Sequence, residues 1–250
     1  MTDAILSVKG LQLGYGDYVL QRDLTFDVKR GDIFFIMGGS GCGKSTLLKS
    51  LIGLTPPQAG AVFHNGKDFW NAPEDEQSVI MRNFGMLYQA GALWSSMTLK
   101  ENVCLPLKEY SKLGKDEIDE MARLKLALVG LAGFEEFYPS EISGGMRKRA
   151  ALARAIALDP HLLFLDEPSA GLDPITSKLL DDLIVALQQT FGMTVIIVSH
   201  ELASILSIGT NSVFLDNRLK TMTAYGNPSL LLKQGDNKSV VSFLSRGENQ

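Results

Sequence analysis

One segment constrains the fold of this 250-residue chain more than any other: an apolar run followed at once by a glycine-rich loop. Residues 33–37 (IFFIM) are typical of a buried strand, and the spacing of Leu47, Leu48 and Leu51 predicts a helix after the loop. Between them, residues 38–45 follow the pattern G-x-x-x-x-G-K-S. Because this pattern stands between strand and helix, its glycines let backbone N–H groups turn inward around phosphate oxygens. The segment therefore predicts an α/β domain that binds a nucleotide.

The loop supplies a first set of candidate ligands. We expect Lys44 to reach the β- and γ-phosphates and Ser45 to ligate Mg²⁺. A glycine-rich turn without a ligand is the alternative, and the agreement of motif and context disfavours it. Cys42 is a small residue that the loop tolerates; its place at a helix start favours a lowered pKa and a thiol that bound nucleotide shields. The predicted nucleotide-binding residues of the loop are Gly38, Gly39, Ser40, Gly41, Cys42, Gly43, Lys44, Ser45 and Thr46.

The remainder of the chain extends the α/β pattern. Short apolar runs alternate with amphipathic stretches, which favours parallel strands joined by helices. Residues 1–30 alternate in polarity instead, and Asn65-Gly66 is a typical hairpin turn, so we expect a small antiparallel β portion. A helical period dominates residues 96–158, beginning with a capping box at Thr98, and this stretch is interpreted as a helical subdomain inserted into the core.

Two buried strands end in polar residues that suit phosphate chemistry. Residues 162–165 are followed by Asp166 and Glu167, and residues 195–198 by Ser199 and His200. Ligands of open α/β sheets bind at the carboxyl ends of strands. Asp166 is therefore expected at the Mg²⁺, Glu167 as the group that polarises the attacking water, and His200 at the γ-phosphate.

Composition excludes several other classes of protein. With 24 Lys and Arg against 28 Asp and Glu, the net charge is −4, so no nucleic-acid partner is expected. Two cysteines make no disulfide framework and indicate a reducing compartment. The N-terminal sequence lacks a leader pattern and no apolar run is long enough for a membrane span, so we expect a chain that is neither secreted nor membrane-spanning by itself. His64 and His161 are predicted to lie at the surface.

A further segment identifies the superfamily. Ser143-Gly144-Gly145 precedes an Ala-rich helix, which alone would indicate only a helix cap. Its position between the phosphate loop and the acidic strand resembles the signature motif of ATP-binding cassette (ABC) ATPases. Other elements resemble that family in the same order: an adenine-stacking aromatic residue, the Q-loop, the D-loop and the switch histidine. In this sequence they are Tyr15, Gln89, residues 169–173 with Asp173, and His200.

The resemblance implies an ABC nucleotide-binding domain at residues 1–235, with a P-loop (RecA-like) core and the helical subdomain at about 90–158. It implies an ATPase with ATP and Mg²⁺ at the site. One phosphate loop and one signature per chain imply a second copy of the chain, and separate transmembrane permease subunits would carry the cargo. The implied catalytic residues are Glu167, His200, Gln89 and Lys44; the implied Mg²⁺ ligands are Ser45, Gln89 and Asp166; and Ser143, Gly144, Gly145 and Asp173 complete the nucleotide site.

Within the superfamily, residues 143–149 (SGGMRKR) and the Q-loop segment 88–98 look like the ATPase of MCE-type lipid transporters, with Ala90 and Trp94 as departures. That likeness implies phospholipid transport between the inner membrane and the outer envelope. It also implies an MCE-type substrate-binding protein, a small cytoplasmic regulatory subunit, and a peripheral place on the cytoplasmic face of the bacterial inner membrane. Alternatives are another importer, a lipoprotein-release or cell-division ATPase, or a soluble iron–sulfur assembly ATPase.

Two segments leave alternatives open. Arg147-Lys148-Arg149 fits either a solvated helix face or an interface. The tail, residues 236–250, carries apolar side chains such as Phe243 and Leu244 that need a covering surface. That surface is either the chain's own domain or a neighbouring subunit, which makes the tail a candidate docking segment.

Overall fold

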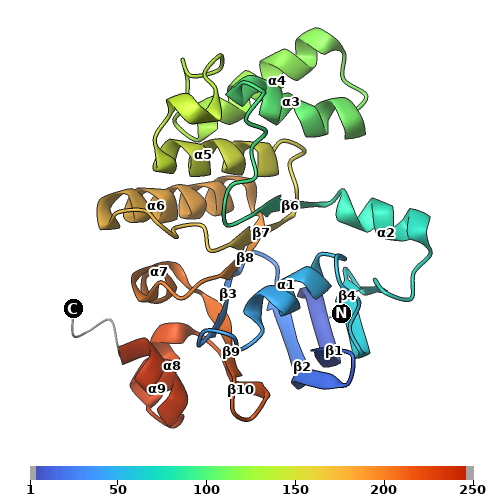
Figure 1. Ribbon diagram of the computed structural model, residues 1–250, viewed down its shortest axis with the longest axis vertical. Coiled ribbons are helices and arrows are strands. Elements are labelled where there is room, and N and C mark those ends of the chain that lie inside the picture. The colour runs from blue at the N-terminus through green and yellow to red at the C-terminus, as the bar shows by residue number, and fades with distance from the viewer. Residues whose placement is uncertain (1–3, 246–250) are drawn as a thin grey trace.

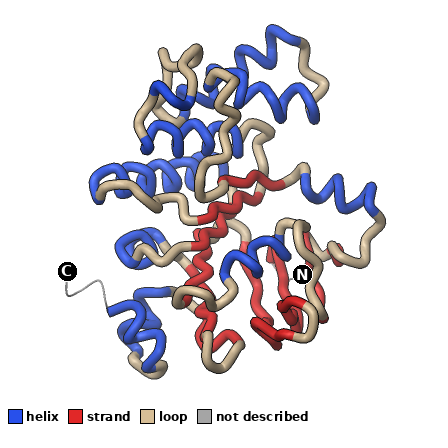
Figure 2. The backbone as a smooth tube through the Cα atoms, in the orientation of Figure 1, coloured by secondary structure: helices blue, strands red, loops and turns tan. Residues whose placement is uncertain are grey.

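The strands of this chain form two sheets. The structure, a computed structural model, describes residues 4–245. A six-stranded sheet has the order β10-β9-β3-β8-β7-β6, and its strands run parallel except for β10, which is antiparallel to β9. Figure 2 shows these strands in red along the middle of the molecule. Their bounds are β3 Ile33–Gly38, β6 Phe84–Leu87, β7 Leu162–Asp166, β8 Thr194–Val198, β9 Asn211–Asp216 and β10 Thr221–Tyr225.

The second sheet is antiparallel and has the order β2-β1-β4-β5. β4 and β5 are joined by the expected turn at Asn65 and Gly66, both of which have positive φ angles. The prediction of a small antiparallel portion is therefore confirmed. The strands are β1 Ala4–Tyr15, β2 Tyr18–Lys29, β4 Ala59–His64 and β5 Lys67–Asp68.

Helices complete the layers around the six-stranded sheet (Figure 1). Side chains of the central strand β3 alternate between two cores: Phe35 and Met37 face one core, and Phe34 and Ile36 face the other. The first core includes α3 to α6, and the second lies between α1 and the antiparallel sheet. The helix bounds are α1 Lys44–Leu51, α2 Glu74–Met81, α3 Leu99–Tyr110, α4 Lys115–Leu128, α5 Gly144–Ala155, α6 Pro174–Phe191, α7 Leu202–Ile208, α8 Pro228–Gln234 and α9 Lys238–Leu244, with a 3₁₀ turn η1 at Pro139–Glu141.

The inserted helices gather at one end of the molecule, at the top of Figure 1. They lie between β6 and β7 in the chain, as the helical period predicts. Thr98 caps α3: its side chain accepts a hydrogen bond from Glu101 N, and Glu101 in turn accepts one from Thr98 N. The α/β core with an inserted helical subdomain is confirmed.

Parallel strands place the polar strand ends together. β3, β7 and β8 are hydrogen-bonded neighbours that run in one direction, so the phosphate loop, Asp166 and the residues after Val198 meet at the same edge of the sheet. No helix among residues 4–245 is long and apolar enough to cross a bilayer.

Two elements differ from expectation or settle an alternative. His64 is buried, not at the surface: it stacks on Phe84 and lies edge-on to Phe69, and its Nε2 lies 2.9 Å from Leu51 O. Helix α9 packs on its own domain, where Phe243 lies edge-on to Phe214 with ring centroids 5.4 Å apart. Residues 246–250 of the predicted tail lie outside the described residues.

Candidate active site

The phosphate loop needs glycine at defined positions. Gly38, Gly41 and Gly43 have φ angles of 150°, 74° and 98°, which side chains rarely tolerate. A Cβ on Gly38 would also lie 2.6 Å from both Cys42 Sγ and Leu215 O. Because these positions exclude a side chain, the loop backbone remains accessible to a ligand.

The loop leads into a helix start that favours an anion. Gly43, the N-cap of α1, provides no side-chain cap, and no acidic residue lies in the first turn. The first N–H groups are thus open to a phosphate, and the helix dipole adds favourable charge. The Lys44 Nζ atom lies over the loop, donating to Gly38 O at 2.9 Å and to Gly39 O at 3.0 Å.

A cavity of about 620 Å³ joins this loop to the polar strand ends. Of the predicted residues outside the loop, it brings in Gln89, Glu167 and His200. Three apolar side chains that the sequence analysis did not single out for the site also line it: Leu20, Leu202 and Phe243. Only the fold brings these distant segments together, so no local sequence signal identifies them. The lining residues from the loop are Gly38, Gly39, Ser40, Gly41, Gly43, Lys44, Ser45 and Thr46.

Tyr15 and Cys42, two of the predicted nucleotide ligands, lie outside the cavity lining, and so does Asp166, a predicted Mg²⁺ ligand. Tyr15 is 59% exposed beside it, and its hydroxyl group lies 3.1 Å from Thr46 Oγ1. Cys42 is fully buried behind the loop. Burial raises the pKa of its thiol, although the nearby Lys44 charge opposes this. The expected lowered pKa and nucleotide-shielded thiol at Cys42 are therefore wrong: the thiol is already inaccessible without a ligand.

Asp166 lies at the end of β7 in a setting that disfavours its charge. Burial raises the pKa of this carboxyl group, and the neighbouring Glu167 carboxylate raises it further. Its Oδ1 atom is buried, and none of residues 4–245 forms a hydrogen bond with it. A buried acceptor without a partner is unfavourable unless a ligand or cation satisfies it.

Glu167 and His200 form a pair at the cavity. His200 Nδ1 lies 2.8 Å from Glu167 Oε1, and the two side chains are 67% and 13% exposed respectively. Glu167 has a φ angle of 46°, in the left-handed region, while its N–H donates to Val198 O at 2.8 Å. This backbone conformation ends the alternation of side chains along β7, and the Glu167 side chain meets His200, which follows β8.

Lys148 is a functional candidate that the sequence analysis missed. Its side chain is 7% exposed, and its Nζ donates to Gln89 O and, at 3.2 Å, to Glu167 O. Burial lowers the pKa of the Lys148 ammonium group, whereas Asp166 and Glu167 raise it. Sequence reasoning took the basic run for a solvated face or an interface, and nothing in one sequence distinguishes an inward lysine there.

The two arginines of that run also bind within the chain. Arg147 Nη1 donates to Ile142 O at 2.8 Å, and Arg149 Nη1 donates to Val129 O and Gly130 O, both at 3.1 Å. The carbonyl partners of Arg149 both belong to the helical subdomain. All three basic side chains of residues 147–149 therefore donate hydrogen bonds to backbone carbonyl groups of their own chain.

The signature and D-loop residues lie apart from the cavity. Ser143 caps α5 by accepting from Met146 N at 3.2 Å, and Gly144 and Gly145 form the first residues of that helix. Asp173 caps α6 by accepting from Ile175 N and Thr176 N. The hydrogen bond from the Thr176 hydroxyl group, followed by these backbone bonds, lowers the pKa of Asp173. None of Ser143, Gly144, Gly145 and Asp173 is among the residues that line the cavity.

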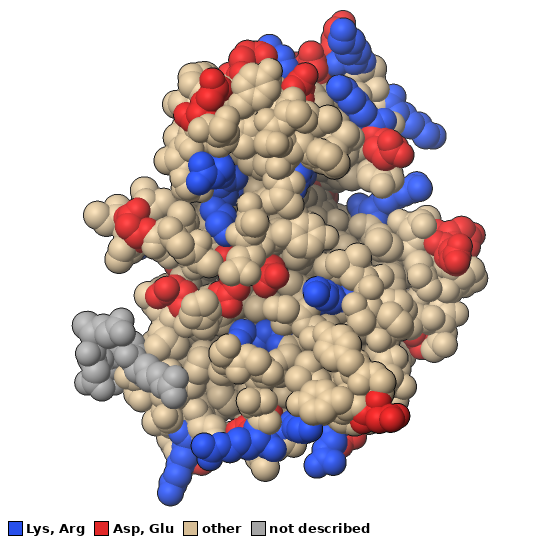
Figure 3. Space-filling model, viewed as in Figure 1, with Lys and Arg blue, Asp and Glu red and all other residues tan. Residues whose placement is uncertain are grey.

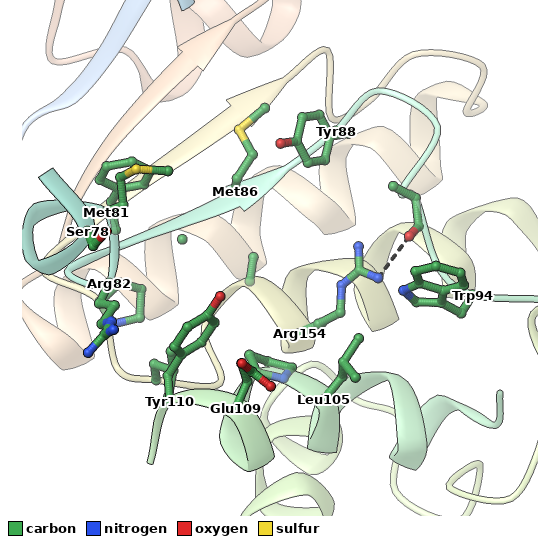
Figure 4. A pocket seen from close by; sticks show the side chains of 17 residues that line it. Ser78, Met81, Arg82, Met86, Tyr88, Trp94, Leu105, Glu109, Tyr110 and Arg154 are labelled. Atoms are coloured by element: carbon green, nitrogen blue, oxygen red, sulfur yellow. Dashed lines mark hydrogen bonds between the residues drawn. The ribbon is translucent and has the colours of Figure 1, made fainter. Parts of the chain in front are cut away.

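A second cavity, of about 850 Å³, lies between α2, β6, α3 and the end of α5; we call it the α2–α3 groove (Figure 4). Trp94 is 57% exposed at one end, and Tyr110 lies at the other, where the Arg82 guanidinium is 5.4 Å from its ring centroid. Figure 3 shows the surface indented between the upper part of the molecule and the lobe at its right. The other labelled residues of the groove in Figure 4 are Ser78, Met81, Met86, Tyr88, Leu105, Glu109 and Arg154.

Polar contacts hold the Q-loop segment at this groove. Arg154 donates to Gly91 O and Ala92 O at 3.0 and 2.8 Å. Asn102 accepts from Trp94 N at 2.8 Å and donates to Trp94 O at 3.1 Å. Leu93 is partly buried against the main core instead. The groove wall is therefore ordered by backbone contacts that leave the Trp94 side chain free.

Comparison with known proteins adds three findings. The sequence profile described as ABC transporter matches residues 21–170. The intermembrane phospholipid transport system ATP-binding protein MlaF of Haemophilus influenzae is 39% identical over 249 residues, which cover 100% of this chain and 93% of that protein. A Mycobacterium leprae protein named as a probable ribonucleotide transport ATP-binding protein, mkl, is 40% identical over 96% of this chain and 68% of its own length.

The fold has solved counterparts. A dimeric ATP-binding cassette in a post-hydrolysis state, bound to ADP and phosphate, superposes with a TM-score of 0.79 at 27% identity and covers 89% of this chain and 98% of its own.

Proposed function

The chain belongs to the ABC transporter family of ATP-binding proteins, and from that premise we propose that it is the ATP-hydrolysing subunit of a phospholipid transporter. The observation that carries the cargo is similarity along the whole chain to a protein named for intermembrane phospholipid transport. The mycobacterial relative is named for ribonucleotides, and ribonucleotide transport is therefore the second candidate. The Ser-Gly-Gly-Met-Arg-Lys-Arg signature, which resembles MCE-type ATPases, favours the lipid.

ATP phosphates would bind at the phosphate loop. The open N–H groups at the start of α1 suit the phosphate oxygens, and Lys44 would exchange its two carbonyl partners for phosphate. Tyr15, exposed beside Thr46, would stack on the adenine ring. The glycines remain essential because a side chain at Gly38 would displace Cys42 or β9.

The residues present also fit a Mg²⁺ ion. Asp166, at the end of β7, would supply a hard oxygen through Oδ1, which has no hydrogen-bond partner among the described residues. Ser45 and Gln89 line the nucleotide cavity and would add further oxygens. Such a set leaves room for phosphate oxygens and waters, as Mg²⁺ prefers. When bound, the ion would neutralise charge that develops on the transferred phosphoryl group.

Hydrolysis would rest on the Glu167–His200 pair. Glu167 would accept the proton of the attacking water, since it is the less exposed partner and faces the cavity. His200 contacts Glu167 through Nδ1 and keeps Nε2 for a hydrogen bond to the γ-phosphate. Loss of the γ-phosphate would then release this contact.

A second copy of the chain would complete the site. Ser143, Gly144, Gly145 and Asp173 lie outside the cavity lining, yet the start of α5 offers N–H groups to an anion. The dimeric solved cassette is consistent with two chains that face each other. ATP would be held between the phosphate loop of one copy and the signature of the other.

The α2–α3 groove would receive a transmembrane permease subunit at the cytoplasmic face of the bacterial inner membrane. Exposed aromatic rings at both ends of the groove suit an apolar segment of that partner. The groove adjoins Tyr88, one residue before Gln89, so a shift of the Q-loop would reach the permease directly. An MCE-type substrate-binding protein and a small regulatory subunit would complete the complex.

The decisive experiment isolates the intact complex from membranes through this chain and identifies its subunits and bound lipids. We expect a polytopic membrane protein, co-purified phospholipid, and altered envelope lipids in a deletion strain. Ribonucleotide uptake lost in that strain, with lipids unchanged, would favour the second candidate. Soluble partners together with defective iron–sulfur enzymes would overturn the transporter assignment altogether.

A further inference from the structure

The position of Lys148 connects two parts of the molecule that serve different ATP molecules in the proposed dimer. Lys148 lies on α5, the same helix that Ser143 caps, and α5 is rigid over the turn and a half between them. The signature at its start would act on the partner's ATP. The two acceptors of Lys148, Gln89 O and Glu167 O, belong to segments that would act on the chain's own ATP.

We infer that Lys148 is a positioning residue that couples the two ATP sites of the dimer, by tying the signature helix to the Q-loop and to the Glu167 turn. This inference rests on the proposed ATP-closed dimer. Through the two hydrogen bonds of Lys148, a nucleotide that orders Gln89 and Glu167 in one site also positions Ser143 to Gly145 for the ATP of the other site.

The surroundings of Lys148 support a role beyond packing. Burial disfavours an ammonium group; Lys148 donates to the neutral carbonyl groups of Gln89 and Glu167, and the nearby Asp166 and Glu167 carboxylates favour its charge. A Gln or Met side chain would fill similar space at lower cost. The Lys148 ammonium group nevertheless connects three segments: α5, the loop after β6, and the end of β7.

The same helix provides a matched control. Arg149 follows Lys148 and also donates to two backbone carbonyl groups, of Val129 and Gly130. Both acceptors belong to the helical subdomain, and neither lines the nucleotide cavity. Loss of Arg149 therefore removes a comparable pair of hydrogen bonds from α5 without cutting the connection to Gln89 and Glu167.

The test uses the full chain with Glu167→Gln, which keeps the Glu167 carbonyl group and stops turnover. Light scattering measures the ATP concentration at half-maximal dimerisation, and equilibrium dialysis under dilute, monomeric conditions measures ATP affinity. Adding Lys148→Gln should raise the dimerisation midpoint at least fivefold while monomer affinity stays within twofold. Lys148→Arg should bring the dimerisation midpoint most of the way back to the parent value. Arg149→Gln should keep the midpoint within twofold of the parent value.

Three results would overturn the coupling role. The first is a Lys148→Gln dimerisation midpoint equal to that of the parent, and the second is a shift no larger than that of Arg149→Gln. The third is a parallel loss of monomer ATP affinity in Lys148→Gln. The last pattern would mean that Lys148 acts only within its own site. A Glu167→Gln parent that stays monomeric in ATP would instead overturn the proposed dimer, and this inference with it.

Discussion

At the residue scale, the Glu167 turn shows how the backbone orients the carboxylate that we propose as the general base. A non-glycine residue at φ 46° costs about 1 kcal/mol or more, and here the hydrogen bonds of Glu167 N to Val198 O and of Lys148 to Glu167 O hold it. The conformation places Oε1 against His200. A residue that simply continued the strand would not reach this partner.

Glu167→Gln should therefore retain ATP binding and lose turnover. The amide cannot accept the proton of the attacking water, so kcat should fall by roughly 10² to 10⁴. Steady-state ATPase assays and equilibrium dialysis check the two halves of this prediction. Glu120→Gln, which removes the same charge from the exposed side of α4, is the control. Turnover near that of the control would show that another group activates the water.

His64 adds a pH dependence to the stability of the fold. Burial lowers its pKa to about 4 from 6.5, so the folded chain keeps this imidazole neutral and bonded to Leu51 O. The unfolded chain takes up the proton first as the pH falls below 6.5. Stability from this group is complete above pH 6.5 and decreases by up to about 1.4 kcal/mol per pH unit toward pH 4.

Replacing His64 tests that dependence. Thermal unfolding at pH 7 and pH 5 should show a smaller loss of Tm for His64→Gln than for the wild type, because glutamine keeps a donor for Leu51 O and takes up no proton. His161→Asn, at an exposed position, should lose as much Tm as the wild type. Equal losses for all three chains would contradict the assignment.

At the element scale, the α2–α3 groove, our proposed permease site, is a cavity separate from the nucleotide cavity. The Trp94 backbone is fixed by Asn102, while its ring is free in the groove. Trp94→Glu should leave the ATPase activity of the isolated chain unchanged. It should weaken permease binding by roughly 30-fold, the scale of about 2 kcal/mol for an aromatic anchor.

Titration of the purified permease subunits with each variant measures this loss. Tyr138→Glu, which places the same charge on an exposed ring outside the groove, is the control. Equal permease affinity for the Trp94 and Tyr138 variants would exclude the Trp94 end of the groove from the interface.

Helix α9 contributes to the stability of the domain through its buried side chains. Val240, Phe243 and Leu244 are buried, so deletion of residues 240–250 removes three apolar side chains from the core and should cost on the order of 5 kcal/mol. Thermal unfolding should show a Tm lower by many degrees. A chain that ends at Ser245 is the control, and an unchanged Tm in the longer deletion would identify α9 as a dispensable attachment.

At the scale of the whole molecule, the sequence predicts those features that depend on interactions between neighbouring residues. The glycine loop, the Thr98 cap and the Asn65-Gly66 turn each depend on a few neighbouring residues, and the layered α/β fold follows from them. Phe243, Leu20 and Lys148 enter the site only through tertiary contacts. The surface prediction for His64 is wrong for the same reason, because the rings that cover it, Phe84 stacked and Phe69 edge-on, are brought to it by the fold.

The residues that line the nucleotide cavity come from nearly the whole length of the sequence, from Leu20 to Phe243. This separation has a consequence while the chain is being synthesised. A nascent chain that has passed Lys44, Glu167 and His200 already carries the chemistry, but the cavity lacks one wall until α9 has been made and packed against Phe214. ATP stabilises only the folded form that binds it. We therefore expect ATP to stabilise chains synthesised through Phe243 more than chains that end before α9.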